Sequence, residues 1–262
     1  MDELAITHTA KVFEDVDADI IAVVEAESQI ALKHFTDAGV APVRVDPPTR
    51  TSCFDGNDDR GIDVGLMTKP THSILAVHPH VDDRDAAGRL VFGRDCPEYT
   101  VQLASGTRIV VLVNHFKSEG HGRQSDNDAK RHQQATRVVE IYDALRTRGE
   151  ENVVCPQGSQ RHPAQRSTEP LLQNTDLRDI ATHPTFSSDG RPGTYANGTA
   201  SRKIDYVLLS PALYSRATGG AIFRKDVWGG KNGALFPHYP TMTSSVHAGS
   251  DHAAIYADVE LD

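Results

Sequence analysis

Carboxylates, histidines and an asparagine stand at the ends of, or inside, short apolar segments of this sequence, where side chains can converge on a cleft. The candidates, each with its segment, are Glu25 after Ile20–Val24, Asn114 and His115 after Ile109–Val113, Asp205 within Lys203–Leu209, and Asp251 and His252 before Ala253–Val259. A carboxylate that fixes and charges a histidine, beside carboxylates that bind a divalent ion, suits phosphodiester hydrolysis. The metal ion neutralises developing charge, and the His–Asp pair orients or deprotonates water.

Each of these residues also has a simpler interpretation. Glu25 could be a solvated carboxylate, and Asp251 could be a turn residue. Asp205 is harder to explain in this way, because a carboxylate buried in the middle of a strand costs several kcal/mol unless it is paired. A histidine is the obvious type of partner for it.

The elements that must position these residues alternate between strand and helix character. Apolar residues at helical spacing predict helices over Thr7–Val16 and Asp128–Arg146. The expected strands are Asp19–Val24, Ile62–Met67, Tyr99–Leu103, Arg108–Val113, Glu151–Val154, Lys203–Leu209 and Ala253–Val259. Many strands, few helices and long loops favour a mixed α/β sandwich over alternating βαβ units.

Composition limits the class of protein. The chain has 262 residues and a net charge of −9, from 27 Lys and Arg against 36 Asp and Glu. No apolar run approaches the roughly 18 residues of a membrane span, and no repeat or linker divides the chain, so one domain over residues 1–262 is expected. The acidic balance excludes binding to nucleic acid by bulk charge but allows phosphate chemistry assisted by a metal ion. The best candidate basic patch, which could equally be a solvated helix face, is Lys117, Arg123, Lys130 and Arg131.

Cysteine usage and the first residues bear on the compartment. Cys53, Cys96 and Cys155 lack CxxC spacing, and an odd number fits neither a disulfide framework nor a zinc site. Acidic residues, Asp2 and Glu3, follow Met1, and no apolar leader region comes after them. The sequence therefore predicts reduced thiols and, by default, a cytoplasmic protein.

Five segments give the chain a resemblance to the endonuclease/exonuclease/phosphatase superfamily, which includes pancreatic-type deoxyribonucleases, apurinic endonucleases and sphingomyelinases. In family order they are Asp17–Glu25, Asp63–Met67, Val111–Ser118, Lys203–Ser210 and Ser250–Ala254. The Ser-Asp-His ending and the Ile-Asp-Tyr strand are specific when they occur together. The resemblance implies an α+β fold, a four-layer α/β/β/α sandwich in which two packed mixed β-sheets are flanked by helices.

The resemblance also implies a role for each candidate residue. The implied roles are metal ligation for Glu25 and Asp251; a catalytic pair for His252 with Asp205; contact with the scissile phosphate or leaving group for His115; weaker phosphate contacts for Asn114, Arg94 and Lys117; and support of His115 by the carboxylate of Asp95. The implied cofactor is Mg²⁺ or Mn²⁺, and the implied substrate is a phosphodiester or phosphomonoester, with DNA as one candidate.

The sequence departs from the family pattern at two places, its beginning and one internal motif. Family members begin with a strand that carries an Asn, and Glu25 comes too early for it, so we expect an N-terminally truncated domain without its first strand. The family's Gly-Asp-Phe/Leu-Asn-Asp motif is replaced by Gln157–Pro163, which lacks both the Asp and the Asn. Reading the codons of Gln157–Ala164 one nucleotide later permits Asp-Leu-Asn-Asp-Thr-Pro, so a frameshift and a diverged loop both stay open. Pro47–Phe54 is a second, weaker candidate for a frameshifted segment.

The sequence thus predicts a divalent-metal-dependent phosphodiester hydrolase by descent. Its activity is expected to be weak or absent, because losing a water-orienting Asp and a positioning Asn each typically costs about 10²- to 10⁴-fold in rate. The alternatives are a non-catalytic scaffold, which binds a phosphate ligand or a partner whose strand completes the sheet, and a non-functional gene fragment. A Ser/His/Asp hydrolase is disfavoured because no Gly-x-Ser-x-Gly elbow occurs.

Overall fold

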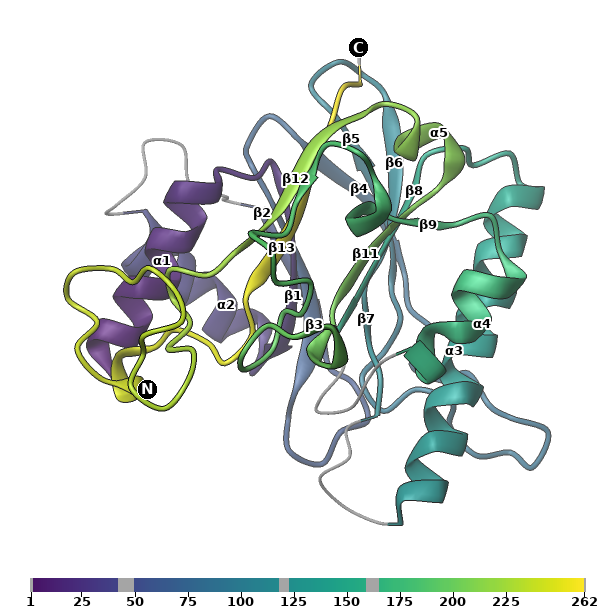
Figure 1. Ribbon diagram of the computed structural model, residues 1–262. Coiled ribbons are helices and arrows are strands. Elements are labelled where there is room, and N and C mark those ends of the chain that lie inside the picture. Colours follow the sequence, from purple (N-terminus) through teal and green to yellow (C-terminus); the bar gives the residue numbers. More distant parts are fainter. Residues whose placement is uncertain (1, 42–49, 118–122, 159–164, 262) are drawn as a thin grey trace.

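The computed structural model describes residues 2–41, 50–117, 123–158 and 165–261 (Figure 1). The largest sheet has seven strands in the order β4-β5-β6-β8-β11-β9, with β7 paired to β8. Its strands are β4 (Ser73–His78), β5 (Glu98–Gln102), β6 (Arg108–Leu112), β7 (Asn114–His115), β8 (Val153–Gly158), β9 (Arg178–Asp179) and β11 (Tyr206–Leu209). Parallel pairing of β6 and β7 with β8 makes this sheet mixed.

Two three-stranded sheets form the second β-layer. One has the order β1-β3-β2 and the other β10-β12-β13. Their strands are β1 (Ile20–Ala26), β2 (Arg50–Phe54), β3 (Asp63–Thr68), β10 (Phe186–Ser187), β12 (Ala217–Phe223) and β13 (Ala254–Val259). β1 and β3 pack on β5 and β6, whereas β13 packs on β8 and β11. Both small sheets therefore cover one face of the seven-stranded sheet.

Helices cover the outer faces of the two β-layers (Figure 1). The helices are α1 (Glu3–Val16), α2 (Gln29–Phe35), α3 (Gln124–Thr147), α4 (Gln165–Asn174) and α5 (Pro211–Tyr214), with a π-helical turn at Thr36–Val40 and 3-10 turns at Ile180–Thr182, Ala200–Arg202 and Ser245–His247. One apolar face of α3, including Val138, Ile141 and Leu145, packs on the seven-stranded sheet. This α/β/β/α arrangement confirms the predicted fold class.

Alternating side chains in β6 show how the sequence builds these layers. Val110 and Leu112 point to the helix-covered side and join the cluster around α3. Ile109 and Val111 point to the opposite side and meet β1 and β3. Successive residues of a strand face opposite sides of the sheet, so a strand buried on both faces is apolar throughout.

Most predicted elements are present with shifted ends. α1 begins four residues earlier than expected, because the Asp2 side chain accepts a hydrogen bond from the Leu4 amide and caps the helix. β11 begins at Tyr206, so Asp205 immediately precedes the strand instead of lying in its middle, which corrects that expectation. The elements that the prediction missed include α2, α4, α5, β4, β9, β10 and β12.

Three further expectations concern the proposed frameshift segments, the cysteines and membrane-spanning helices. Residues 42–49 and 159–164 lie outside the described part of the chain, and so do most of Gln157–Ala164 and the first three residues of Pro47–Phe54, whereas Arg50–Phe54 form β2. All three cysteines are free thiols, as predicted. Within the described ranges, no helix is both long and apolar enough to cross a membrane.

Candidate active site

His252 and Asp205 form a hydrogen-bonded pair. His252 Nδ1 lies 2.8 Å from Asp205 Oδ2, and the Thr194 hydroxyl donates to the same oxygen. Residue 252 also forms an isolated antiparallel bridge with Tyr195, whose ring lies 5.1 Å from the imidazole between ring centroids. These contacts orient the imidazole so that Nε2 is turned away from the carboxylate.

Glu25 lies beside His115 at the end of β1. Glu25 Oε1 is 3.8 Å from His115 Nε2, although the two residues come from different β-layers. The Glu25 backbone is left-handed, with φ of 61°, and a β-bulge interrupts the β1–β3 register at this point. A left-handed non-glycine residue is strained and is frequent at functional sites. The bulge turns the Glu25 side chain out of the strand alternation.

Two arginines share one carboxylate next to this pair. Arg94 Nη2 lies 3.0 Å from Asp58 Oδ2, and Arg60 Nε lies 3.0 Å from Asp58 Oδ1. The Arg94 side chain is buried and also donates to the Phe116 carbonyl, whereas 42% of the Arg60 side chain is exposed. The hydrogen bond from Arg60, partly opposed by burial and assisted by the charge of Arg94, lowers the pKa of Asp58 to about 2.

The two histidines have opposite pKa shifts. Burial, followed by the charge of Arg94, holds the pKa of His115 well below its usual range. Burial also acts to lower the pKa of His252, but the hydrogen bond and charge of Asp205, with Asp251 and Glu25, outweigh it and raise that pKa. His115 is therefore neutral near pH 7, and His252 is the better proton acceptor.

Strand β8 reaches this site through its pairing with β7. Asn114 is opposite Gln157 and His115 is opposite Gly158 in the parallel β7–β8 register. The buried Asn114 side chain donates from Nδ2 to the Leu112 carbonyl, while Oδ1 has no hydrogen-bond partner among the residues that the structure describes. Gly158 presents no side chain where β8 reaches the site, so the described part of β8 contributes no carboxylate.

Asp95 does not support His115. Asp95 Oδ1 accepts hydrogen bonds from the amides of His80 and Cys96, and within the described chain His115 Nδ1 has no hydrogen-bond partner. The carboxylate instead fixes the backbone of the loop between β4 and β5. This position corrects the expectation that paired Asp95 with His115.

Lys117 and Asp251 lie at the margin of the site. Burial, followed by the charges of Arg94 and Arg60, lowers the pKa of Lys117, which shows that these cations share one neighbourhood. Asp251 is exposed on the segment before β13, and its charge acts on His252. Among the predicted residues, the structure thus brings Glu25, His115, Asp205 and His252 together, with Arg94 and Lys117 beside them.

Sequence reasoning missed Asp58, Arg60 and Thr194. Asp58 and Arg60 occupy the turn-rich segment Asp55–Gly61, where a dense group of charges directly before a buried strand was the available signal. Thr194 contacts Asp205 from a loop that carries no periodicity. Its role follows from the tertiary structure alone.

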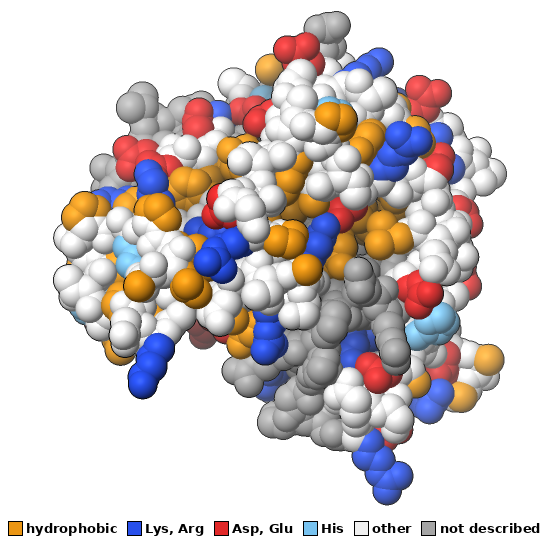
Figure 2. All heavy atoms as spheres, viewed as in Figure 1, with side chains coloured by type: hydrophobic (Ala, Val, Ile, Leu, Met, Phe, Trp, Pro, Cys, Tyr) orange, Lys and Arg blue, Asp and Glu red, His pale blue; other side chains and the backbone are white. Residues whose placement is uncertain are grey.

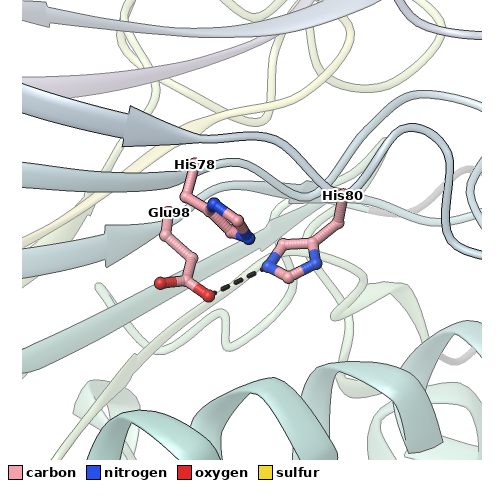
Figure 3. Close-up of side chains that lie close together, drawn as sticks. All are labelled: His78, His80 and Glu98. Atoms are coloured by element: carbon pink, nitrogen blue, oxygen red, sulfur yellow. Dashed lines mark hydrogen bonds and ion pairs between the residues drawn. The ribbon is translucent and has the colours of Figure 1, made fainter. Parts of the chain in front are cut away.

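A separate group of possible metal ligands consists of His78, His80 and Glu98 (Figure 3). His80 Nε2 lies 2.9 Å from Glu98 Oε1, and His80 Nδ1 lies 3.0 Å from Asp83 Oδ2. Glu98 Oε2 accepts a hydrogen bond from Arg148 at the end of α3. Both nitrogens of His80 and both oxygens of Glu98 therefore have protein partners, and the group links β4 and β5 to α3 as a polar network.

The predicted basic patch is largely engaged in internal contacts. Arg131 donates to the Lys117 carbonyl and pairs with Asp128, and Lys130 donates to the Leu90 carbonyl. Basic and acidic side chains are also interspersed on the face seen in Figure 2. Because Arg131 is buried and Lys130 is half-buried, these residues do not form a freely exposed basic surface for long nucleic acids.

Comparison with known proteins identifies the family. Among solved structures, a mannosyl-6-phosphatase from Bacteroides thetaiotaomicron has a TM-score of 0.69 and 16% identity, covering 98% of this chain and 91% of that chain. An endonuclease/exonuclease/phosphatase from Bacteroides vulgatus has a TM-score of 0.65 and 16% identity, with 99% and 91% covered. A 3'-5' exonuclease from Neisseria meningitidis has a TM-score of 0.59 and 15% identity, with 98% and 95% covered.

At these identities the structural likeness shows the fold alone. No curated protein matches the chain. The sequence model of the Endonuclease/Exonuclease/phosphatase family, however, matches residues 1–259, which is nearly the whole chain. The chain therefore belongs to the endonuclease/exonuclease/phosphatase family.

Proposed function

We propose that this protein is a divalent-metal-dependent hydrolase of phosphate esters in which His252, held by Asp205, orients or deprotonates the attacking water. The observation that carries the proposal is the 2.8 Å contact between His252 Nδ1 and Asp205 Oδ2. The carboxylate fixes the ring and stabilises its protonated form, so Nε2 is the atom that accepts the proton of water. Family membership and the named phosphatase and exonuclease relatives support phosphate esters as the substrate class.

Glu25 and Asp251 are the proposed ligands of Mg²⁺ or Mn²⁺. Carboxylate oxygens are the hard ligands that these ions prefer, and Mg²⁺ is commonly bound by one or two carboxylates with waters and substrate oxygens. Both carboxylates act on the pKa of His252, so their charges bear on the same small region. The donor set therefore fits such an ion. When bound, it would neutralise charge on the phosphate.

His115 is the proposed contact for the scissile phosphate or leaving group. It is kept neutral by burial, so one ring nitrogen can donate a hydrogen bond without a charge of its own. Lys117 and Arg94 supply positive charge next to it, and Arg60 is the more exposed cation. Asn114 supplies a buried amide oxygen that has no hydrogen-bond partner in the described part of the chain. The substrate is a phosphodiester or phosphomonoester, with DNA as one candidate.

The test uses the purified chain with bis(p-nitrophenyl) phosphate, p-nitrophenyl phosphate and plasmid DNA, each with Mg²⁺, Mn²⁺ or EDTA. We expect slow, metal-dependent hydrolysis that EDTA abolishes. Hydrolysis that is unaffected by EDTA would contradict the metal requirement. Absence of any hydrolysis above buffer with all three substrates would favour the second candidate below.

The second candidate function is a non-catalytic binding scaffold. The specific observation in its favour is that, within the described residues, β1 pairs only with β3 and β13 only with β12, so each has one edge without a paired strand beside the site. Unpaired strand edges are templates for adding a strand from a partner. This candidate predicts binding of a phosphate ligand or a peptide without turnover.

A further inference from the structure

The side chains of His78, His80 and Glu98 converge at one end of the β4–β5 pair, and we call them the His-Glu cluster. His78 ends β4, Glu98 begins β5, and the two are direct partners in the antiparallel register. His80 follows His78 by two residues, so in an extended backbone it faces the same side. One ligand atom of each residue lies within 4.8 Å of the others, and the three side chains are turned toward one another (Figure 3). Two imidazoles and a carboxylate therefore share one small region.

His80 lies between two carboxylates. Its Nδ1 is 3.0 Å from Asp83 Oδ2, and its Nε2 is 2.9 Å from Glu98 Oε1. Arg137 pairs with Asp83 and Arg148 with Glu98, and a neighbouring positive charge favours the ionised carboxylate. An ionised carboxylate only accepts hydrogen bonds, and a neutral imidazole has one N–H to donate. One of the two contacts of His80 therefore needs a further cation, which is either a second proton on the ring or a metal ion.

The contacts around His80 and Glu98 are those that typically surround metal ligands. A metal-binding histidine usually donates its other N–H to a carboxylate, and a ligating carboxylate is in turn hydrogen-bonded. Here Asp83 lies on Nδ1 of His80, which leaves the Nε2 lone pair facing the cluster. Arg148 Nη2 lies 2.7 Å from Oε2 of Glu98, which leaves Oε1 facing the same point. The outer partners therefore present one ligand atom of each residue to a shared position.

His78 gives the cluster an open side. It is exposed, whereas His80 and Glu98 are only 7% and 9% exposed. The ring of His78 meets that of His80 nearly edge-on, with the ring centroids 5.0 Å apart. Two ligand atoms on a tetrahedral zinc ion are about 3.3 Å apart, because Zn–N bonds are roughly 2.0 Å long. A rotation of the exposed ring closes the remaining gap, and the same side admits an ion from solvent.

The donor set favours zinc over the ion proposed for Glu25 and Asp251. Imidazole nitrogen suits Zn²⁺ and similar transition metals, whereas Mg²⁺ takes oxygen ligands. Two histidines and one glutamate also make a common zinc-binding set, with the remaining position open to water. The two groups of residues therefore differ in the ion that they prefer.

We propose that the His-Glu cluster binds one Zn²⁺ ion through His78, His80 and Glu98, outside the candidate active site. The ion replaces the cation that the contact between His80 Nε2 and Glu98 Oε1 needs. It links the end of β4 to the start of β5, and the hydrogen bond from Arg148 to Glu98 extends this link to the end of α3. The inference concerns metal binding and does not depend on hydrolytic activity.

The proposed ion holds the loop between β4 and β5 at both of its ends, through His80 and Glu98. Within the loop, Asp95 Oδ1 accepts a hydrogen bond from the amide of His80. Arg94, the neighbour of Asp95, pairs with Asp58 in the candidate active site. Zinc should therefore slow local opening of a loop that carries a residue of that site.

The test titrates Zn²⁺ into the metal-free full chain, in competition with a chromophoric chelator and with Mg²⁺ in excess. We expect one equivalent of Zn²⁺ whose binding depends on His78. His78→Asn should weaken this binding by about 100-fold or more, since loss of an outer partner alone typically costs about 10- to 100-fold. Because His78 is exposed, the variant should keep the fold, which circular dichroism checks. His34→Asn, at an exposed position of α2, is the matched control and should bind zinc as the unmodified chain does.

A second pair of variants tests the outer contacts. Asp83→Asn should weaken zinc binding by about 10- to 100-fold, because it no longer holds the His80 ring as a carboxylate does. Asp82→Asn, at an exposed position of the same loop, should leave the affinity unchanged. Hydrogen exchange gives a local measurement. Zn²⁺ should slow exchange of the loop amides by about tenfold or more in the unmodified chain, but not in His78→Asn.

Two results would overturn the proposal. Equal zinc affinity of His78→Asn and the unmodified chain would place the ion elsewhere. Absence of any Zn²⁺ binding would show that a second proton on His80, and not a metal ion, completes its contact with Glu98.

Discussion

Gly158 is paired with His115 across the parallel β7–β8 register, and a Cβ atom at Gly158 would lie 3.4 Å from Asp205 Oδ1. A carboxylate introduced at this position would enter the site beside an existing one, and two close carboxylates raise each other's pKa. We therefore predict that Gly158→Asp combined with Gln160→Asn, a residue outside the described ranges, does not by itself restore strong activity. Mg²⁺-dependent nicking of plasmid DNA measures this.

The comparison for that prediction is the unmodified chain assayed at the same metal concentrations. We expect both proteins to be slow, because in both the edges of β1 and β13 beside the site have no paired strand among the described residues. Vigorous plasmid cleavage by the double variant would show that the loop residues alone limit activity.

His252→Asn and Asp205→Asn should each reduce whatever metal-dependent hydrolysis the chain shows by about 10²- to 10⁴-fold. The reason is that Asp205 acts through the imidazole, 2.8 Å away. Because the two residues act as a unit, the double variant should be no slower than the slower single variant. Initial rates with bis(p-nitrophenyl) phosphate provide the measurement.

His132→Asn is the matched control, since His132 is exposed on α3 and far from the pair in the fold. It should leave the rate unchanged. Additive losses in the double variant would mean that Asp205 and His252 contribute separately, and the proposed pairing would have to be abandoned.

Arg94→Gln should destabilise the protein by about 2–4 kcal/mol, because it removes a buried guanidinium that pairs with Asp58 and donates to the Phe116 carbonyl. Arg60→Gln breaks a contact with the same carboxylate, but the Arg60 side chain is 42% exposed, so its loss should cost about 0–1 kcal/mol. Urea unfolding of both variants measures the difference. Equal losses would show that burial does not distinguish the two arginines.

Residues at strand ends were predictable from the sequence because local pattern fixes them. A continuous apolar run that ends in Glu25, and another that ends in Asn114 and His115, define both the strand and the residue leaving it. The residues alone indicated only that the Asp205 carboxylate needs a partner such as a histidine, and the choice of His252 came from the family resemblance. Their approach across 47 positions is a tertiary result.

The contacts of loop residues could not be predicted, because no local sequence pattern fixes them. Asp95 binds the amides of His80 and Cys96 because of how the β4–β5 loop folds, and nothing in the local sequence indicates that choice. Asp58 and Arg60 lie in a turn without periodicity, and their position depends on Arg94 from another loop. The split of one β-layer into two sheets also depends on which strands find neighbours.

Asp226 should make stability depend on pH. Burial raises the pKa of this carboxyl to about 7, whereas an unfolded Asp titrates near 4. Between these values the unfolded chain has released the proton and the folded chain still holds it. Stability therefore falls as pH rises from about 4 to about 7, and the penalty persists above that range.

Asp226→Asn removes this titration. Relative to the unmodified chain, the variant should gain little at pH 4 and should gain progressively up to pH 7, reaching a few kcal/mol by pH 8. The measurement is the free energy of unfolding in urea at each pH, with Asp258→Asn at an exposed position of β13 as the control that shows no such trend. A difference between Asp226→Asn and the unmodified chain that stays constant from pH 4 to pH 8 would mean that Asp226 is ionised in the folded protein, and hence that a donor reaches its buried Oδ1.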